Sequence, residues 1–290
     1  MKFSINYILM TIFITGCMAA APSKMNYPAN NVNSINVITC NTGNLGSSKR
    51  LDSAELANYL KSCGEYDIYF LQEVAGESAA HYLADKLDMP DHLFLKDQKR
   101  KQGIAILSRW KIKSSDHIYF TVSPRGYGAI SADIEINSQT IKFVNIHLDR
   151  YDNVSIKNGD VGFNVVSMVD FMKEELFSES IRSRSIMELM EWLLPDINEK
   201  NHIIVAGDFN TVPLSKTIKL MKSKFNDTIS EFKNMSKGTY IRHRAPFPVR
   251  IDYIFYTKNL LCLYSAIIEK SPGDHYPVVA SFKSWEDNSD

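Results

Sequence analysis

The sequence has no long apolar run and no excess of charge of either sign. Its apolar stretch near the start, Ile5 to Ile14, is too short to span a bilayer. The chain carries 33 Lys and Arg against 33 Asp and Glu, so its formal net charge is zero. Without a general positive field there is no overall attraction for nucleic acid, and any anion-binding site must be local.

Cysteine is also scarce. The four cysteines lack the close spacing of metal ligands and are too few to form a disulfide framework in 290 residues. What the chain does have is a 44% hydrophobic and 23% charged composition, typical of a soluble globular protein. Helical spacing predicts helices at Ser53–Cys63, Glu77–Leu87, Ser180–Asn198 and Leu214–Lys224, with apolar strands between them. No linker interrupts residues 35–285, so we predict one α/β domain with mixed sheets.

The first 34 residues have the pattern of an export signal followed by a tether. Lys2 precedes the short apolar run, and Ile14-Thr15-Gly16-Cys17 resembles the lipobox of bacterial lipoproteins. We therefore predict a signal peptide at 1–21, with Cys17 at the cleavage site, and a flexible tether at 22–34. An ordinary signal peptide cut near Ala21 is the alternative. Either form predicts an exported protein, membrane-anchored or secreted.

A buried strand in the second half of the chain ends in polar side chains. Ile203-Ile204-Val205-Ala206 is followed by Gly207-Asp208-Phe209-Asn210. Asp208 and Asn210, two residues apart, would lie at the same edge of a sheet. A carboxylate can hold a hard cation or orient a water, and an amide can donate to a phosphate oxygen. Asp and Asn after a strand are also common turn formers, so this motif needs support from elsewhere.

Other predicted strand ends along the chain carry similar groups. If two sheets pack face to face, these ends can converge at one rim. Together they offer acids, amides and two histidines, with no serine or cysteine nucleophile near them, which favours metal-assisted attack by water. The residues are Asn41, Gln72-Glu73, His147-Leu148-Asp149, Arg250-Ile251-Asp252 and Asp274-His275.

Seven blocks of the sequence resemble, in order, those of the endonuclease/exonuclease/phosphatase superfamily. The resemblance covers residues 35–283 and implies a four-layer α/β sandwich, with two packed mixed sheets flanked by helices, as in deoxyribonuclease I. The blocks are Thr39-Cys40-Asn41, Leu71-Gln72-Glu73-Val74, 103–109, Asn145-Ile146-His147-Leu148-Asp149, Gly207-Asp208-Phe209-Asn210-Thr211, 250–255 and 273–278.

The resemblance also implies a metal site. Glu73 would be the main ligand of Mg²⁺ or Mn²⁺, with Asn41 and Asp274 beside it. Mg²⁺ prefers oxygen ligands and keeps several waters, so one or two protein carboxylates suffice.

The same resemblance assigns roles in catalysis. Asp252 would orient His275, which acts as general base toward the attacking water. Asp208 would position that water, Asn210 would donate to the phosphoryl group, and His147 would stabilise the phosphate or the leaving group.

Local basic residues suggest how a substrate is bound. Lys99 and Arg100 belong to the basic run 96–101, while Arg242, Arg244 and Arg250 precede the predicted Asp252 strand. Arginines there could hold non-scissile phosphates through paired hydrogen bonds. Solvated charge runs without a ligand are the alternative.

Two substrate classes stay open at this point. A nuclease would use the basic clusters on nucleic acid. A sphingomyelinase-like phosphodiesterase or phosphoinositide phosphatase would instead bring the apolar residues of segment 150–180 to a phospholipid membrane. In both cases we predict a monomeric, metal-dependent phosphoesterase, with a lipid at Cys17 as a possible membrane contact.

Overall fold

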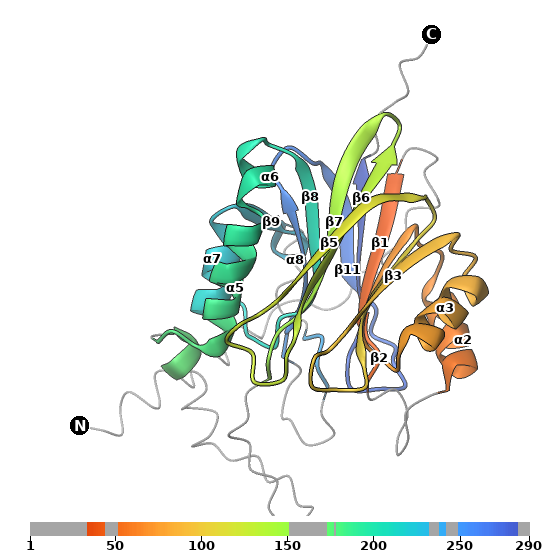
Figure 1. Ribbon diagram of the computed structural model, residues 1–290, viewed down its shortest axis with the longest axis horizontal. Coiled ribbons are helices and arrows are strands. Elements are labelled where there is room, and N and C mark those ends of the chain that lie inside the picture. The colour runs from red at the N-terminus through yellow and green to blue at the C-terminus, as the bar shows by residue number, and fades with distance from the viewer. Residues whose placement is uncertain are drawn as a thin grey trace, which may run out of the picture.

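The computed structural model describes residues 34–43, 52–150, 173–176, 178–231, 238–241 and 249–283. These form two six-stranded sheets packed face to face, with helices on both outer faces (Figure 1). The predicted signal peptide with Cys17, the tether up to residue 33 and most of segment 150–180 lie outside the described residues. None of the described helices is long and apolar enough to cross a membrane.

The first sheet has the strand order β11-β12-β1-β2-β4-β3. β1 and β2 are parallel, and the other neighbours are antiparallel. Its strands are β1 (Ser34–Asn41), β2 (Ile68–Val74), β3 (Asp91–Lys96), β4 (Gly103–Ser108), β11 (Cys262–Ile267) and β12 (Val278–Lys283).

The second sheet has the order β5-β6-β7-β8-β10-β9, in which only β7 and β8 run parallel. Both sheets are therefore mixed, as predicted. The strands are β5 (Ile112–Tyr119), β6 (Gly128–Ile136), β7 (Gln139–His147), β8 (His202–Asp208), β9 (Phe225–Asp227) and β10 (Asp252–Thr257).

Three of the described helices begin after a residue whose side chain caps them, namely Asp52, Ser180 and Ser215. The Asp52 side chain accepts hydrogen bonds from the backbone N–H groups of Ala54 and Glu55, and the Glu55 side chain accepts one from the Asp52 backbone N–H. The predicted single helix at 180–198 is wrong, because it breaks at Leu193: Pro195 has no N–H to continue the ladder. The helices are α2 (Ser53–Cys63), α3 (Glu77–Lys86), α5 (Ile181–Trp192), α6 (Leu194–Asn198), α7 (Lys216–Lys222) and α8 (Thr228–Glu231).

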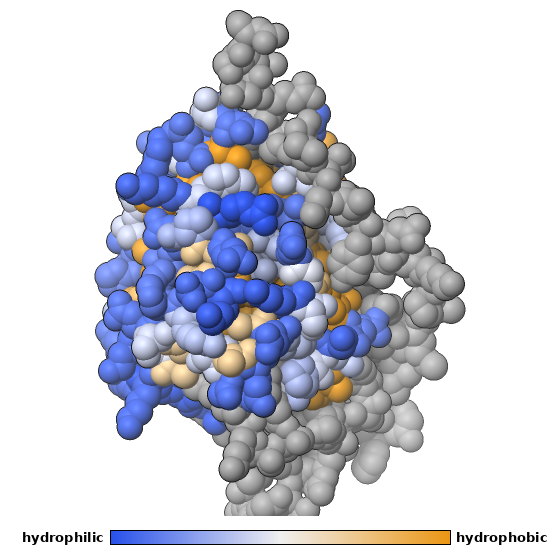
Figure 2. All heavy atoms as spheres, turned by 90° about the vertical axis from the view of Figure 1, so that its right-hand side faces the viewer, coloured by the Kyte–Doolittle hydropathy of each residue, from blue (hydrophilic) through white to orange (hydrophobic). Residues whose placement is uncertain are grey.

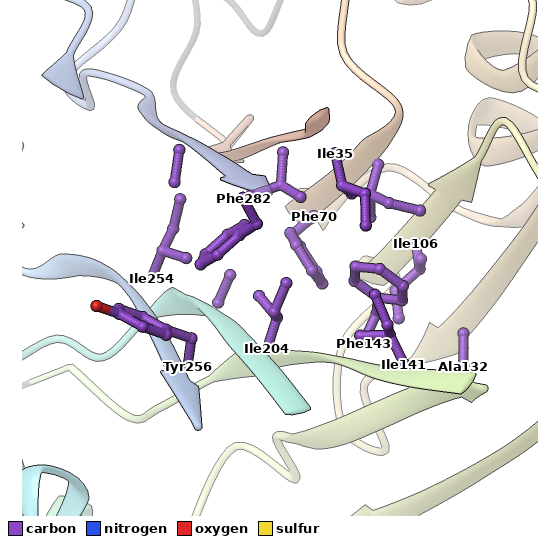
Figure 3. Packing of buried hydrophobic residues seen from close by; sticks show 14 of the residues in the cluster. Ile35, Phe70, Ile106, Ala132, Ile141, Phe143, Ile204, Ile254, Tyr256 and Phe282 are labelled. Carbon is purple, nitrogen blue, oxygen red and sulfur yellow. The ribbon is translucent and has the colours of Figure 1, made fainter. Parts of the chain in front are cut away.

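Three apolar layers hold the fold together and confirm the four-layer sandwich. Between the sheets, side chains such as Phe70, Phe143 and Phe282 fill the central layer (Figure 3). A second layer lies between the first sheet and helices α2 and α3, and a third between the second sheet and helices α5 and α7. The molecular face on the side of α2 and α3 is mainly hydrophilic (Figure 2).

Candidate active site

The predicted strand ends meet at one end of the sandwich, the lower end in Figure 1. Asp208 ends β8 and lies directly opposite Asp252 of β10 and His147 of β7 in the second sheet. Asn41 ends β1 in the first sheet, and His275 precedes β12 of that sheet. All five are buried, with at most 6% of their surface exposed. Burial and their mutual contacts together therefore control their charge states.

Asp208 is the centre of the group. Its Oδ2 accepts a 2.9 Å hydrogen bond from Asn41 Nδ2, which joins the two sheets. The same oxygen lies 3.7 Å from His147 Nε2 and 3.9 Å from His275 Nε2. Burial and the neighbouring charge of Asp252 raise the pKa of Asp208 well above the usual carboxyl range, although His275 and Asn41 oppose the shift.

The glycine before Asp208 allows this close assembly. Gly207 has φ +149°, and a Cβ there would lie 1.9 Å from the Ile146 carbonyl oxygen on the neighbouring strand. A side chain at this position would push β8 away from β7. In the Gly-Asp motif, the glycine is therefore required for steric reasons, and the aspartate supplies the chemical group.

His275 is paired with Asp252. Its Nδ1 lies 3.1 Å from Oδ1 and 3.0 Å from Oδ2 of that carboxylate. Burial alone would lower the pKa of His275, but the charge and hydrogen bond of Asp252, with Asp208 and Asp274 adding to them, raise it to about 10. The ring therefore carries a proton at neutral pH.

His147 has a different environment. Its ring stacks on Tyr127 at a centroid distance of 4.1 Å and an interplanar angle of 19°. Its Nδ1 is buried and has no hydrogen-bond partner among the described residues. Burial lowers its pKa to about 4, outweighing the attraction of Glu73 and Asp149, so this ring is neutral at pH 7. Tyr127 was not predicted, and its only sequence signal is an aromatic residue between two glycines.

Oxygen ligands for a cation lie on the first-sheet side. Glu73 has φ +56°, and Gly43 packs so close that a Cβ there would lie 1.8 Å from Glu73 Oε2. Gly43 N donates to Asn41 Oδ1 at 2.9 Å, so the side-chain oxygens of Asn41 and Glu73 share this cradle. A carboxylate and an amide oxygen are the hard ligands that Mg²⁺ or Mn²⁺ takes, so these residues fit the predicted metal.

A second group of potential ligands is buried nearby. Atoms of Asp208, Asp252 and His275 lie within 4.8 Å of one another and could hold a metal ion. Asp252 and His275, however, already bond to each other through His275 Nδ1. We therefore consider the Glu73 and Asn41 pair the better cation site. Asp274, the third predicted ligand, precedes His275 and contributes charge that raises its pKa.

Asn210 lies beside the centre in a left-handed conformation, φ +50°. Its backbone N–H donates to Asp208 Oδ1 at 2.9 Å, and its side-chain amide donates to the Leu148 carbonyl at 2.8 Å. One N–H of that amide is thus engaged, which fixes the orientation of the second. The arrangement is consistent with a donor to a bound phosphoryl oxygen.

The two sheets are also joined beneath the site. Gln72 Nε2 donates to Asn145 Oδ1 at 2.8 Å, and Asn145 Nδ2 donates to the carbonyls of Leu71 and Ala105. Both side chains are fully buried. Gln72, adjacent to Glu73 in its motif, therefore has a structural task.

The predicted substrate-binding residues separate into three groups. The prediction that Arg250 binds substrate is wrong. Arg250 is 4% exposed, and its Nη1 and Nη2 donate to Asp227 at 3.0 and 2.5 Å. Its guanidinium is thus used in an internal ion pair and cannot hold substrate. Arg242 and Arg244 lie outside the described residues. Lys99 donates to the Pro124 carbonyl at 3.0 Å.

Arg100 is the best placed of the predicted basic residues. Its guanidinium lies 5.6 Å from the centroid of the Tyr127 ring, which in turn stacks on His147. Within the described part of the chain its guanidinium makes no hydrogen bond or ion pair, although its charge opposes the rise in the pKa of the buried Asp97 carboxyl. Nearby, Arg125 bonds Asp149 Oδ1 at 3.0 Å, which ties Asp149 into the structure of this wall.

The sequence profile of the Endonuclease/Exonuclease/phosphatase family matches residues 31–275. The chain belongs to this family. Members are phosphoesterases that typically depend on a divalent metal, which supports a hydrolase whose substrate is a phosphoester. No curated protein sequence matches the chain.

Solved structures show the same fold. TDP2 from C. elegans is 15% identical with a TM-score of 0.63, covering 87% of this chain and 75% of its own. A mannosyl-6-phosphatase from Bacteroides thetaiotaomicron is 15% identical with a TM-score of 0.62, covering 86% and 99%. A functionally unknown protein from Enterococcus faecalis is 17% identical with a TM-score of 0.64, covering 87% and 100%. At these identities the likeness concerns the fold alone.

Proposed function

We propose that this protein is a Mg²⁺-dependent hydrolase of phosphodiesters, in which Mn²⁺ can substitute. The observation that carries the proposal is the buried Asp208–His275–Asp252 group beside the oxygens of Asn41 and Glu73. Glu73 and Asn41 would hold the cation, with Asp274 nearby. When bound, the cation supplies positive charge that offsets the negative charge growing on the phosphoryl group.

The proton of the attacking water goes to Asp208 in this proposal. A carboxylate with a raised pKa, held by Asn41, is a suitable base near neutral pH. The family resemblance implies His275 for this task; we propose Asp208 in its place, because the charges of Asp252 and Asp208 raise the pKa of His275 and favour its protonated form. We therefore propose that His275, held by Asp252, contacts a phosphoryl oxygen as a cation. The proposal fails if activity rises only above pH 9, where His275 would become neutral.

His147 and Asn210 would complete the phosphate side. The neutral His147 can donate from a ring nitrogen without needing a second charge, and Asn210 has one amide N–H beyond its bond to Leu148. Neither donor adds a negative charge to a site that already contains several carboxylates.

Nucleic acid is the substrate class we favour. Arg100, whose guanidinium lies 5.6 Å from the Tyr127 ring centroid on the His147 side, is a cation that would contact the phosphate next to the scissile one. The phospholipid alternative depends on segment 150–180, most of which lies outside the described residues. We further propose that the protein is exported, through Cys17 lipidation or secretion, and acts as a monomer.

A comparison of substrates tests the proposal. The purified protein would be incubated with Mg²⁺ and either plasmid DNA or liposomes containing sphingomyelin and phosphoinositides, with EDTA and His275→Ala as controls. Nicking of DNA that both controls abolish supports the nuclease. Turnover of lipid without nicking would replace it with the phospholipid hydrolase, and hydrolysis that resists EDTA would contradict the metal requirement.

A further inference from the structure

Asp252 and His275 come from different sheets. Asp252 opens β10 in the second sheet, and His275 precedes β12 in the first. Their bond of 3.0 Å therefore depends on the spacing between two layers that meet mainly through apolar side chains, with hydrogen bonds from Asn41 to Asp208 and from Gln72 to Asn145 elsewhere. Apolar packing fixes such a spacing less sharply than directional hydrogen bonds do.

A short segment, Thr239-Tyr240-Ile241, spans this gap. On the side of Asp252, Thr239 Oγ1 accepts the backbone N–H groups of Ile251 and Asp252, both at 3.0 Å. The backbone of Tyr240 pairs in both directions with Val249, with its N–H donating at 2.8 Å. Thr239 is completely buried, so these N–H groups have their acceptor in a site that excludes water.

The other side of the segment holds the His275 loop. The N–H of Tyr276 donates to the Thr239 carbonyl at 2.6 Å, and the N–H of Ile241 donates to the Asp274 carbonyl at 2.7 Å. The Tyr240 ring meets the His275 ring edge-on, with centroids 5.0 Å apart and planes at 64°. Residues on both sides of His275, and its ring, thus contact the segment.

We infer that Thr239 and Tyr240 are positioning residues that hold Asp252 and His275 in register across the two sheets. This inference rests on the proposed function for its catalytic consequence. Through its Oγ1, Thr239 fixes the position of the first residue of β10, Asp252. Through its carbonyl, Thr239 fixes the position of Tyr276, the residue after His275. Tyr240 limits the tilt of the imidazole ring. A displacement of about 1 Å between catalytic groups can reduce turnover roughly 100-fold.

Three threonine variants separate positioning from ordinary stabilisation. Thr239→Val keeps the shape and removes the acceptor, whereas Thr239→Ser keeps the acceptor. Thr257→Val is the matched control, because Thr257 Oγ1 accepts the Ile203 N–H at 3.0 Å at the far end of β10. With Mg²⁺ and bis(p-nitrophenyl) phosphate, we expect Thr239→Val to lower kcat roughly 10- to 100-fold, with KM changed less than about twofold.

The remaining variants should behave differently. Thr239→Ser restores kcat to within a few-fold of wild type, and Thr257→Val lowers the melting temperature without changing kcat. Tyr240→Leu leaves the hydrogen bonds of Thr239 in place and removes only the ring contact with His275, so we expect it to lower kcat as well. This variant tests the inference even if Thr239→Val fails to fold. Equal kinetic effects of Thr239→Val and Thr257→Val, or a wild-type kcat in Tyr240→Leu, would overturn the inference.

A spectroscopic readout does not need activity. The proton between His275 Nδ1 and Asp252 should give a low-field NMR signal that shifts or broadens in Thr239→Val and Tyr240→Leu and stays unchanged in Thr257→Val. An unchanged signal in the first two variants would contradict the inference. If the wild-type protein hydrolyses no phosphodiester, the proposed function fails, and this signal still decides whether the segment positions the pair.

Discussion

The two histidines of the site are alike in position and differ in charge, because His275 is protonated and His147 is neutral. Both are buried, and both place Nε2 within 4 Å of the same oxygen of Asp208, at 3.7 Å for His147 and 3.9 Å for His275. Yet the pKa is lowered to about 4 in His147 and raised to about 10 in His275. The difference lies on the opposite ring nitrogen, where His275 has Asp252 and His147 has no described partner. Burial lowers the pKa of a histidine, and a buried carboxylate on its second nitrogen reverses the result.

The residues around the two histidines differ in the same way as the pKa values of their rings. The His275 side is held by hydrogen bonds and charges that cross from one sheet to the other. The His147 side is built on the Tyr127 ring, with Arg100 beyond it. One side is therefore suited to hold a permanent cation, and the other to present a neutral donor and an external arginine to a substrate.

Breaking the His275 partnership should have the largest effect. Asp252→Asn removes the carboxylate that stabilises the imidazolium, so we expect kcat to fall roughly 10²- to 10⁴-fold. The hydrolysis of bis(p-nitrophenyl) phosphate with Mg²⁺ measures this. A variant that retains more than about a tenth of wild-type kcat would show that the Asp252 charge is unimportant.

The second-largest effect that we expect is a loss of folding stability when the buried Arg250–Asp227 ion pair is broken. Arg250→Leu leaves the buried carboxylate of Asp227 without its ion-pair partner, which should cost about 3–5 kcal/mol of unfolding free energy. Urea unfolding measures the loss, and the double variant with Asp227→Leu should recover most of it. If Arg250→Leu has normal stability and a raised KM, Arg250 binds substrate and the internal ion pair is not its main role.

The pH dependence of stability tests the His147 side. The folded state keeps His147 neutral to about pH 4, while the unfolded state binds a proton below about pH 6.5. Stability should therefore fall as the pH drops from 6.5 to 4, by about 3 kcal/mol from this group. The difference in urea-derived free energy between wild type and His147→Gln, measured across this range, isolates it. A pH-independent difference would show that His147 is not buried neutral.

Arg100 should give the smallest effect. If its guanidinium contacts a phosphate beside the scissile one, Arg100→Gln raises KM for DNA about tenfold, which corresponds to about 1.4 kcal/mol. Lys99→Gln is the control, since Lys99 is occupied with the Pro124 carbonyl. Equal effects of the two variants would indicate a general charge contribution and no specific contact at Arg100.

Much of this arrangement could be predicted from the sequence, because it depends on local patterns. Apolar strands that end in Asn41 and Asp208 or begin near Asp252 predicted polar strand ends, and the family resemblance supplied the packed sheets at whose rim they converge. The charge difference between the histidines could not be predicted, since it depends on which distant side chain reaches each second nitrogen. Arg250 was misassigned for the same reason: its partner Asp227 lies on a three-residue strand that has no clear periodicity.

The most direct test of the account is the protonation of the two histidines. Nitrogen-detected NMR of the ¹⁵N-labelled protein, titrated with and without Mg²⁺ and assigned with His147→Gln and His275→Gln, reports each ring separately. We expect His275 at pH 7 to be an imidazolium bonded to Asp252 and His147 to be neutral. Two rings that both titrate near pH 6.5, or a neutral His275 at pH 7, would contradict it.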